Sequence, residues 1–113
     1  RKRVTFVLML RCDPRELVER LEARGWMRAK ILENVISEAL GSIYDGVDEE
    51  FLQAVIEVDT SSRRPNEVVD DLFYKLENNA FGRTVDWLQA DEVLEMLPLW
   101  LREFDSYKYG LPQ

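Results

Sequence analysis

The sequence predicts an α/β layer fold with parallel strands, because two short apolar strand-like runs alternate with amphipathic helices. The first run, Val4 to Leu10, lacks polar alternation except at Thr5, which is typical of a parallel strand covered on both faces. The second strand is expected at about Ala54 to Val58. The predicted order is strand, helix, turn, helix, strand, helix, helix, and such alternation favours parallel strands.

The helix ends carry local signals. Asp13 is the expected N-cap of the first helix, with Pro14 at the first helical position and Gly25 marking its end. Apolar residues at a four-residue spacing predict a second helix from about Arg28 to Leu40. The glycines and acidic residues of 41–50 predict a loop or a broken helix.

The second half is expected to hold two further helices. One begins at Pro65, has an apolar stripe and breaks at Asn78 and Asn79. The last, rich in Leu, Met and Trp, is expected from about Asp91 to Phe104, and the tail after it is expected to be irregular. The apolar residues of this half are expected in the core: Trp87, Leu97, Leu99, Trp100 and Leu101.

Composition excludes several kinds of site. The chain has 113 residues, 46% of them apolar and 33% charged, as expected for one globular domain or part of one. It has no histidine, which excludes Ser-His-Asp catalysis and histidine metal sites, and one cysteine cannot form a Cys-rich zinc site. No metal site, membrane span or signal peptide is predicted. Cys12 is expected to be buried at a strand end, which suits a reducing cytoplasmic or nuclear location.

The net charge of −7 is unevenly distributed. Residues 1–40 hold nine basic and six acidic residues, whereas residues 41–113 hold six basic and sixteen acidic ones. The acidic part argues against direct nucleic-acid binding through the phosphate backbone. The basic part fits either a site for a small anion or the solvated face of a helix.

Two strands are few for a doubly covered sheet, so the sequence also predicts association. An unpaired apolar edge favours pairing with another strand. We therefore expect a homo-oligomer or a complementing N-terminal half, with an interface on a strand edge or on the apolar helix faces.

The segments "TFVLMLRCDPRELVERLEARGW", "ENV..EAL" and "IEVDTSSRRPNEVVDDL" resemble the C-terminal half of the atypical adenylate kinases of archaea and eukaryotic nuclei, a family also linked to assembly of the small ribosomal subunit. The resemblance covers about residues 4–76. The matching positions are Arg11, Asp13, Leu17, Arg20, Leu21, Arg24, Gly25, Trp26, Lys30, Glu33, Asn34, Glu38, Asp59 and Thr60.

The resemblance implies a three-layer Rossmann-like P-loop kinase fold, of which this chain holds the C-terminal part with about two parallel strands and four to five helices. It divides the chain into a strand and helix (1–23), a lid-like segment (24–40), a strand and helix (54–78), and a C-terminal helix and tail (84–113). It also implies phosphoryl transfer between ATP and AMP with Mg²⁺, or ATP hydrolysis coupled to a ribosomal protein.

By position, Arg24 is the expected catalytic residue and, with Lys30, approaches the nucleotide phosphates when the lid closes. Asp59, Arg63 and Arg64 belong to the loop expected beside the adenine. Guanidinium and ammonium groups suit this chemistry because phosphoryl transfer places negative charge on the equatorial oxygens.

The chain departs from the family at one essential motif. Nothing in it matches the phosphate-binding pattern G-x-x-x-x-G-K-[ST]. Two lid positions also differ, because Ala29 stands where the family usually has Lys and Arg28 replaces an acidic neighbour. Two other hypotheses therefore stay open: a non-catalytic binding module whose acidic surface takes a basic partner, and a homo-oligomeric scaffold.

Overall fold

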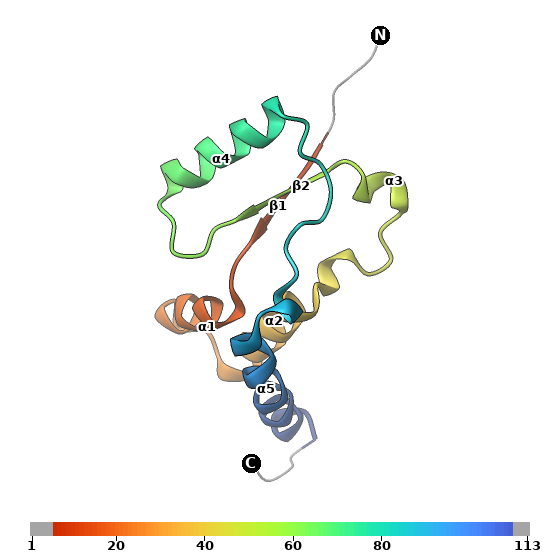
Figure 1. The fold of residues 1–113 in the computed structure, drawn as a ribbon. Coiled ribbons are helices and arrows are strands. Elements are labelled where there is room, and N and C mark those ends of the chain that lie inside the picture. Colours follow the sequence, from red (N-terminus) through yellow and green to blue (C-terminus); the bar gives the residue numbers. More distant parts are fainter. Residues whose placement is uncertain (1–5, 110–113) are drawn as a thin grey trace. The chain divides into compact units, whose positions relative to one another are not determined.

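The computed structural model describes residues 6–109, with side chains through Lys108. It contains two parallel strands and five α-helices (Figure 1), so the predicted α/β class is confirmed. The chain forms two compact units. The strand unit comprises residues 6–12 and Tyr44–Val85, and the helical unit comprises Asp13–Ile43 and residues 86–109.

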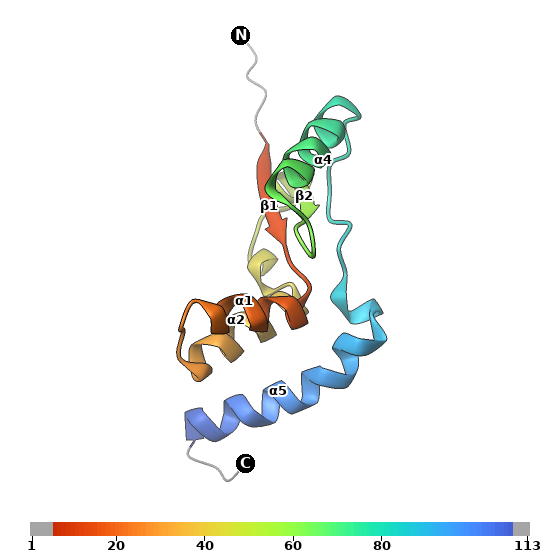
Figure 2. The same ribbon diagram turned by 90° about the vertical axis from the view of Figure 1, so that its left-hand side faces the viewer.

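The strand unit is built on strands β1 (Val7–Arg11) and β2 (Val55–Asp59). They pair in parallel, with Val7 opposite Val55 and Arg11 opposite Asp59. The short helix α3 (Glu49–Leu52) precedes β2, and helix α4 (Pro65–Glu77) packs against β2, as both ribbon views show (Figure 2). The helix that was predicted to begin at Pro65 is confirmed.

The two strands differ in burial. The first four residues of β2 are buried, whereas Leu8 and Leu10 of β1 are 39% and 56% exposed. The prediction that Val4 to Leu10 is covered on both faces is therefore wrong for Leu8 and Leu10. The reason is that β1 is an edge strand of a two-stranded sheet, and α4 packs on β2. Val4 and Thr5 lie outside the described residues.

The helical unit consists of α1 (Pro14–Ala23), α2 (Arg28–Leu40), the 3₁₀ turn η2 (Trp87–Gln89) and α5 (Asp91–Tyr109). Helix α2 packs against both α1 and α5 (Figure 2), so it is the central helix of the unit. The buried core takes residues from all three helices: Leu21, Ile31, Leu32, Val35, Ile36, Ala39, Val93 and Trp100.

The predicted start of α1 and the predicted end of α2 are confirmed. The Asp13 carboxylate accepts a hydrogen bond of 2.9 Å from the Arg15 amide, and Pro14 is the first residue of α1. Helix α2 ends at Leu40 because Gly41 takes a left-handed conformation with φ of 67°.

Helix α5 departs from the prediction in length and burial. It continues to Tyr109, so the expected irregular tail is wrong for residues 105–109. No glycine or proline follows Pro98 before Gly110, so nothing in the sequence breaks the helix earlier. Trp100 is buried as expected, but Leu99 and Leu101 are 55% and 40% exposed and do not belong to the core.

The central position of α2 predicts a large cost for truncating its core. Leu32 is fully buried, so Leu32→Ala should destabilise the helical unit by about 2–5 kcal/mol through lost burial and a residual cavity. Leu40→Ala is the matched control in the same helix, because Leu40 is 47% exposed. Urea unfolding followed by tryptophan fluorescence reports on this unit, which holds Trp26, Trp87 and Trp100. Equal effects of the two substitutions would contradict the packing described here.

Candidate functional site

The five predicted site residues fall in both units. Arg24 and Lys30 belong to the helical unit, and Asp59, Arg63 and Arg64 belong to the strand unit. Both groups lie at ends of secondary-structure elements. Asp59, Arg63 and Arg64 lie at the carboxyl end of β2, the end at which parallel α/β sheets carry ligand sites.

The turn between α1 and α2 presents Arg24 to solvent. Arg24 is the C-cap of α1, and Gly25 follows it with φ of 76°, a conformation that glycine adopts without strain. Arg24, Trp26 and Met27 are all exposed. Among residues 6–109 the Arg24 side chain forms no hydrogen bond or ion pair. It is therefore available to an anion.

Lys30 lies in the first turn of α2 and is also exposed. Its Nζ is 3.5 Å from a carboxylate oxygen of Glu33, and its carbonyl accepts a hydrogen bond of 2.9 Å from the Asn34 side chain. Such an exposed pair is weak. Lys30 can therefore exchange this carboxylate for another anion at little cost.

Arg28, a basic residue between these two, has a structural role. Its guanidinium donates to both carboxylate oxygens of Glu103 in α5, at 2.7 and 2.9 Å, and lies 3.4 Å from Glu22. Hydrogen bonding to Glu103 raises the pKa of Arg28, and the same bonds lower the pKa of Glu103. Arg28 thus joins the start of α2 to α5.

The loop after β2 is held by its own polar groups. The Asp59 carboxylate accepts hydrogen bonds from the Ser61 amide at 2.9 Å and the Ser61 hydroxyl at 2.6 Å. Arg63 donates to the Asp59 carbonyl and to the Asp71 carboxylate, both at 2.9 Å. Asp59 and Arg63 are thus brought together, and the side chains of both already form hydrogen bonds within the protein.

Arg64 is exposed and serves as the N-cap residue of α4. Its amide donates to the Glu67 carboxylate at 3.0 Å. Of the three loop residues, Arg64 is the one whose side chain is exposed. It is the better candidate for an external contact.

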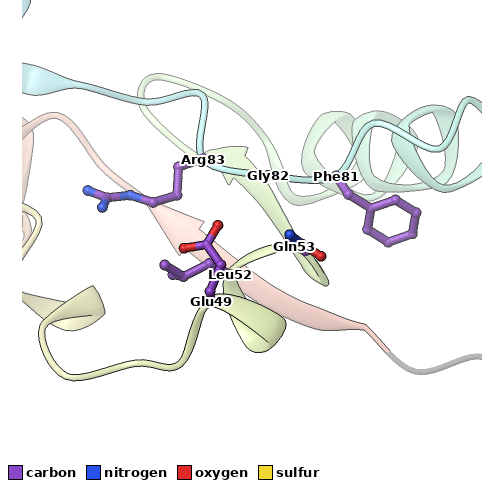
Figure 3. Close-up of a pocket in the computed structure, with 6 residues that line it drawn as sticks. All are labelled: Glu49, Leu52, Gln53, Phe81, Gly82 and Arg83. Carbon is purple, nitrogen blue, oxygen red and sulfur yellow. The ribbon is translucent and has the colours of Figure 1, made fainter.

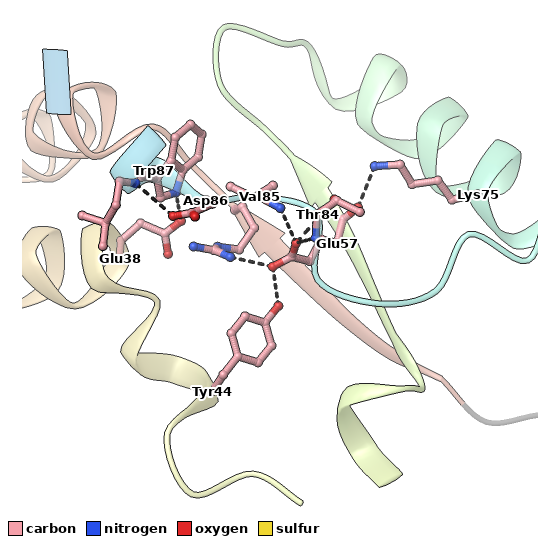
Figure 4. A network of polar contacts seen from close by, with 10 residues as sticks. Glu38, Tyr44, Glu57, Lys75, Thr84, Val85, Asp86 and Trp87 are labelled. Atoms are coloured by element: carbon pink, nitrogen blue, oxygen red, sulfur yellow. Dashed lines mark hydrogen bonds and ion pairs between the residues drawn. The ribbon is translucent and has the colours of Figure 1, made fainter. Parts of the chain in front are cut away.

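A buried network around Glu57 is the feature that sequence reasoning missed. Glu57 lies in the middle of β2 with its side chain fully buried (Figure 4). One carboxylate oxygen accepts from Arg11 at 2.5 Å and from the Tyr44 hydroxyl at 2.6 Å. The other accepts from the amides of Thr84 and Val85 at 2.5 and 2.7 Å.

These donors keep Glu57 ionised. Burial raises the pKa of its carboxyl, but the hydrogen bonds from Tyr44, the two amides and Arg11 outweigh burial, and the pKa lies below its usual value of 4.5. Burial and the neighbouring carboxylate raise the pKa of Tyr44 far above normal, so the hydroxyl stays protonated and donates. The only sequence signal was a glutamate within the apolar run "VIEV".

Tyr44 also contacts two guanidinium groups. Arg83 lies over its ring with the guanidinium carbon 4.3 Å from the ring centroid, and the guanidinium carbon of Arg11 is 5.7 Å from the same centroid. These are cation–π distances. Tyr44 thus contacts the side chain of Arg83, which directly precedes the two residues whose amides bind Glu57.

A pocket of about 450 Å³ lies between α3 and the segment after α4 (Figure 3). None of the predicted site residues lines it. Its walls combine charged, amide and apolar groups: Glu49, Leu52, Gln53, Phe81, Gly82 and Arg83.

The described residues offer no resident metal site. Over residues 6–109 no three acidic or cysteine side chains gather in a way that could hold a metal ion. Cys12 is buried directly after β1, as predicted, and forms no disulfide. No helix in the same part of the chain combines the length and apolarity needed to cross a membrane.

The chain is similar to proteins named "putative adenylate kinase". One from Sulfurisphaera tokodaii is 37% identical over 102 residues, which is 90% of this chain and 51% of that protein. Others come from Thermococcus gammatolerans, 41% identical over 97 residues (83% and 54%), and Pyrococcus abyssi, 37% identical over 100 residues (85% and 54%). The chain spans about half the length of the curated relatives it matches. No protein-family model matches it.

The Glu57 network predicts an acid-sensitive strand unit. Glu57→Gln should cost about 3–5 kcal/mol at pH 7, because Arg11 then lacks its buried counter-charge. The pKa of Glu57 is lowered by folding, so its stabilisation is present above pH 4.5 and is lost as the pH falls through the folded-state pKa. The difference in unfolding free energy between the two proteins should therefore shrink from pH 7 to pH 3.

Urea unfolding followed by far-ultraviolet circular dichroism at several pH values measures this difference. Other carboxylates are common to both proteins, so they cancel in the comparison. Glu50→Gln is the control, because Glu50 is an exposed residue of the same unit. A difference that does not depend on pH would contradict the assignment of an ionised Glu57.

Proposed function

We propose that this chain is the lid-bearing part of an adenylate-kinase-type enzyme that transfers a phosphoryl group between ATP and AMP. The observation that carries the proposal is the similarity to relatives named "putative adenylate kinase", which covers 90% of the chain in the Sulfurisphaera tokodaii comparison. A match of that extent includes the exposed Arg24 turn. The geometry of that turn supports the same function, because Arg24 is exposed and makes no ion pair with another residue of the described part of the chain.

The residues present fit only part of an ATP–Mg²⁺ site. The sequence has no phosphate-binding loop, and the described residues have no carboxylate cluster for Mg²⁺. The groups that grip the β-phosphate and the metal would have to come from outside this chain. This chain would contribute only basic side chains and the loop after β2.

Within that limit each residue has a role. Arg24 would donate to phosphoryl oxygens on which charge develops in the transition state, and Lys30 would add a mobile point charge. Arg64 would flank the adenine. Asp59 and Arg63 would hold the shape of the adenine loop, because both are already hydrogen-bonded within it.

A lid made from residues 24–40 would move as a packed unit. Helix α2 is the centre of the helical core and is fastened to α5 by Arg28 and Glu103. The turn at Arg24 to Met27 is the exposed part. Closure would exclude water and so direct the phosphoryl group to AMP.

A second candidate is the binding of a basic protein, such as a ribosomal protein, with or without ATP hydrolysis. The observation that favours it is the excess of sixteen acidic over six basic residues in 41–113. Opposite charges on two partners raise the rate of association, and this rate falls as the salt concentration rises. A cytoplasmic or nuclear location would suit either function.

The isolated chain should bind Mg-ATP weakly, with a dissociation constant above about 1 mM. The physical reason is that backbone amides of a phosphate loop supply most of the donors to the phosphates, and this sequence lacks that loop. Isothermal titration calorimetry on residues 1–113 measures it. Micromolar affinity would show that the chain holds a complete nucleotide site of its own.

In a chimaera that joins this chain to the unmatched half of the Sulfurisphaera tokodaii relative, Arg24→Ala should lower turnover by about 10²-fold. The affinity for ATP should change much less, because the charge that Arg24 neutralises grows in the transition state. Coupled assays of ADP formation give both quantities. Arg102→Ala is the matched control, because Arg102 is another exposed arginine of the helical unit. Equal turnover in both variants would remove Arg24 from the mechanism.

A further inference from the structure

The pocket between α3 and the segment after α4 is separate from the residues assigned to the nucleotide. It belongs to the strand unit and lies at the amino end of β2, because it is lined by Gln53, just before this strand, and by Gly82, whose amide donates to the Val55 carbonyl at 2.6 Å. Asp59 and the loop after it lie at the carboxyl end of the same strand. A strand rises about 3.3 Å per residue, so the two ends of β2 are roughly 13 Å apart.

Both walls of the pocket are anchored to β2. On one side, helix α3 is joined to the strand by two residues. On the other side, the residues that flank Arg83 are bonded to β2: Gly82 donates to the Val55 carbonyl, and the Thr84 amide donates to the Glu57 carboxylate at 2.5 Å. The backbone of Arg83 is therefore positioned before any ligand binds, which lowers the entropic cost of binding.

The guanidinium of Arg83 is held in place without using its hydrogen-bond donors. It lies over the buried ring of Tyr44, with the guanidinium carbon 4.3 Å from the ring centroid. Its N–H groups form no hydrogen bond or ion pair with another residue in the described part of the chain. A positioned guanidinium with free N–H groups matches a carboxylate, which can accept two parallel hydrogen bonds from it.

The α3 wall adds a carboxylate and an amide that are also unpaired. Glu49 is the first residue of α3 and Gln53 is its C-cap, so the two stand about one helical turn apart. Both are exposed, and neither side chain bonds to another residue within 6–109. Glu49 and Arg83 line the same pocket, yet they do not pair with each other. Each can therefore take a ligand group of the opposite charge.

The remaining side chains of the pocket are apolar. Phe81 is 38% exposed, and Leu52 is partly buried. Figure 3 shows Phe81 at the opposite end from Arg83, with Gln53 between them. The volume of about 450 Å³ lies within the range of about 300–1,000 Å³ that is usual for small-molecule sites. The pocket thus offers two opposite charges, an amide and an aromatic ring to one small ligand.

We propose that this pocket binds a small zwitterion of the amino-acid class with an apolar side chain. Arg83 receives the carboxylate, Glu49 receives the ammonium group, and Phe81 packs against the side chain of the ligand. A purely anionic ligand would be repelled by Glu49 and by the net charge of −7, and a purely cationic one by Arg83. This inference goes beyond the proposed function and does not depend on it.

Three probe molecules test the proposal on the full chain. L-Phenylalanine carries both charges, 3-phenylpropanoate lacks the ammonium group, and 2-phenylethylamine lacks the carboxylate. Phenylalanine should bind with a dissociation constant of about 1 mM or lower, and each analogue about tenfold or more weakly, because it lacks one charge-assisted hydrogen bond. Nuclear magnetic resonance titration of the ¹⁵N-labelled chain at pH 7 measures all three affinities.

The same spectra locate the binding site. The amide resonances of Gln53, Gly82 and Arg83 should move as phenylalanine is added, because these residues line the pocket. The Gly25 amide belongs to the helical unit and is the internal reference, so it should stay in place.

Two variants assign the charges individually. Glu49→Gln should weaken phenylalanine binding by about tenfold without weakening that of 3-phenylpropanoate, and Arg83→Gln should weaken phenylalanine binding similarly without weakening that of 2-phenylethylamine. Glu50→Gln is the matched control and should change none of the affinities, because Glu50 is the neighbouring exposed glutamate and does not line the pocket. Circular dichroism of each variant verifies folding, and the comparison of the three probes on the unaltered chain requires no variant.

Several results would overturn the proposal. Phenylalanine might as well be absent if it moves no resonance of the pocket, or moves only resonances outside it. Equal affinities for the three probes would show that the two charges are not read, and a preference for 3-phenylpropanoate would identify an anion site instead. Phenylalanine binding that survives both Glu49→Gln and Arg83→Gln would contradict the assigned contacts.

Discussion

The burial of one carboxylate, Glu57, constrains the whole strand unit. Removing a charge from water costs several kcal/mol unless donors replace the lost hydration. Here the donors come from the end of β1, from Tyr44 and from the amides of residues 84 and 85. Three stretches far apart in sequence must therefore meet at one point in β2. Because each oxygen of Glu57 accepts from two of these donors, moving any one of them would leave the buried carboxylate with fewer hydrogen bonds.

The Glu57 network also fixes the start of the loop that is proposed to lie beside the adenine. Arg11 binds Glu57 through its side chain, and its carbonyl accepts both the amide and the hydroxyl of Thr60 at 2.7 Å. Thr60 directly follows β2, so the carboxyl ends of both strands are tied together. Asp59 and Arg63 then shape the loop. A ligand at this edge of the sheet would meet a loop whose geometry is set before binding, which lowers the entropic cost of association.

Local signals predicted the elements, and long-range contacts explain what the sequence left out. Apolar spacing and end signals identified α2, the Asp13 cap and the helix starting at Pro65, because these depend on neighbours within one or two turns. The exposure of Leu10 could not be predicted, since it depends on how many strands flank β1. Glu57 was missed because its partners Arg11 and Tyr44 lie 46 and 13 residues away. The 75-residue separation of Arg28 and Glu103 hid their pairing in the same way.

The ion pairs in the structure show which basic residues are free to bind a phosphate and which already bind a carboxylate. A guanidinium that already binds a partly buried carboxylate must break those bonds to bind a phosphate, so Arg28 and Arg63 are poor ligands for an incoming anion. Arg24 carries no such cost, because it is exposed at the end of α1 and has no ion-pair partner among the described residues. Arg24 also stands beside Gly25, whose positive φ turns the chain there and leaves the guanidinium outside the helical core. The pairs that stabilise the fold thus leave one arginine of the turn available, and it is the one that the adenylate-kinase resemblance assigns to the phosphates.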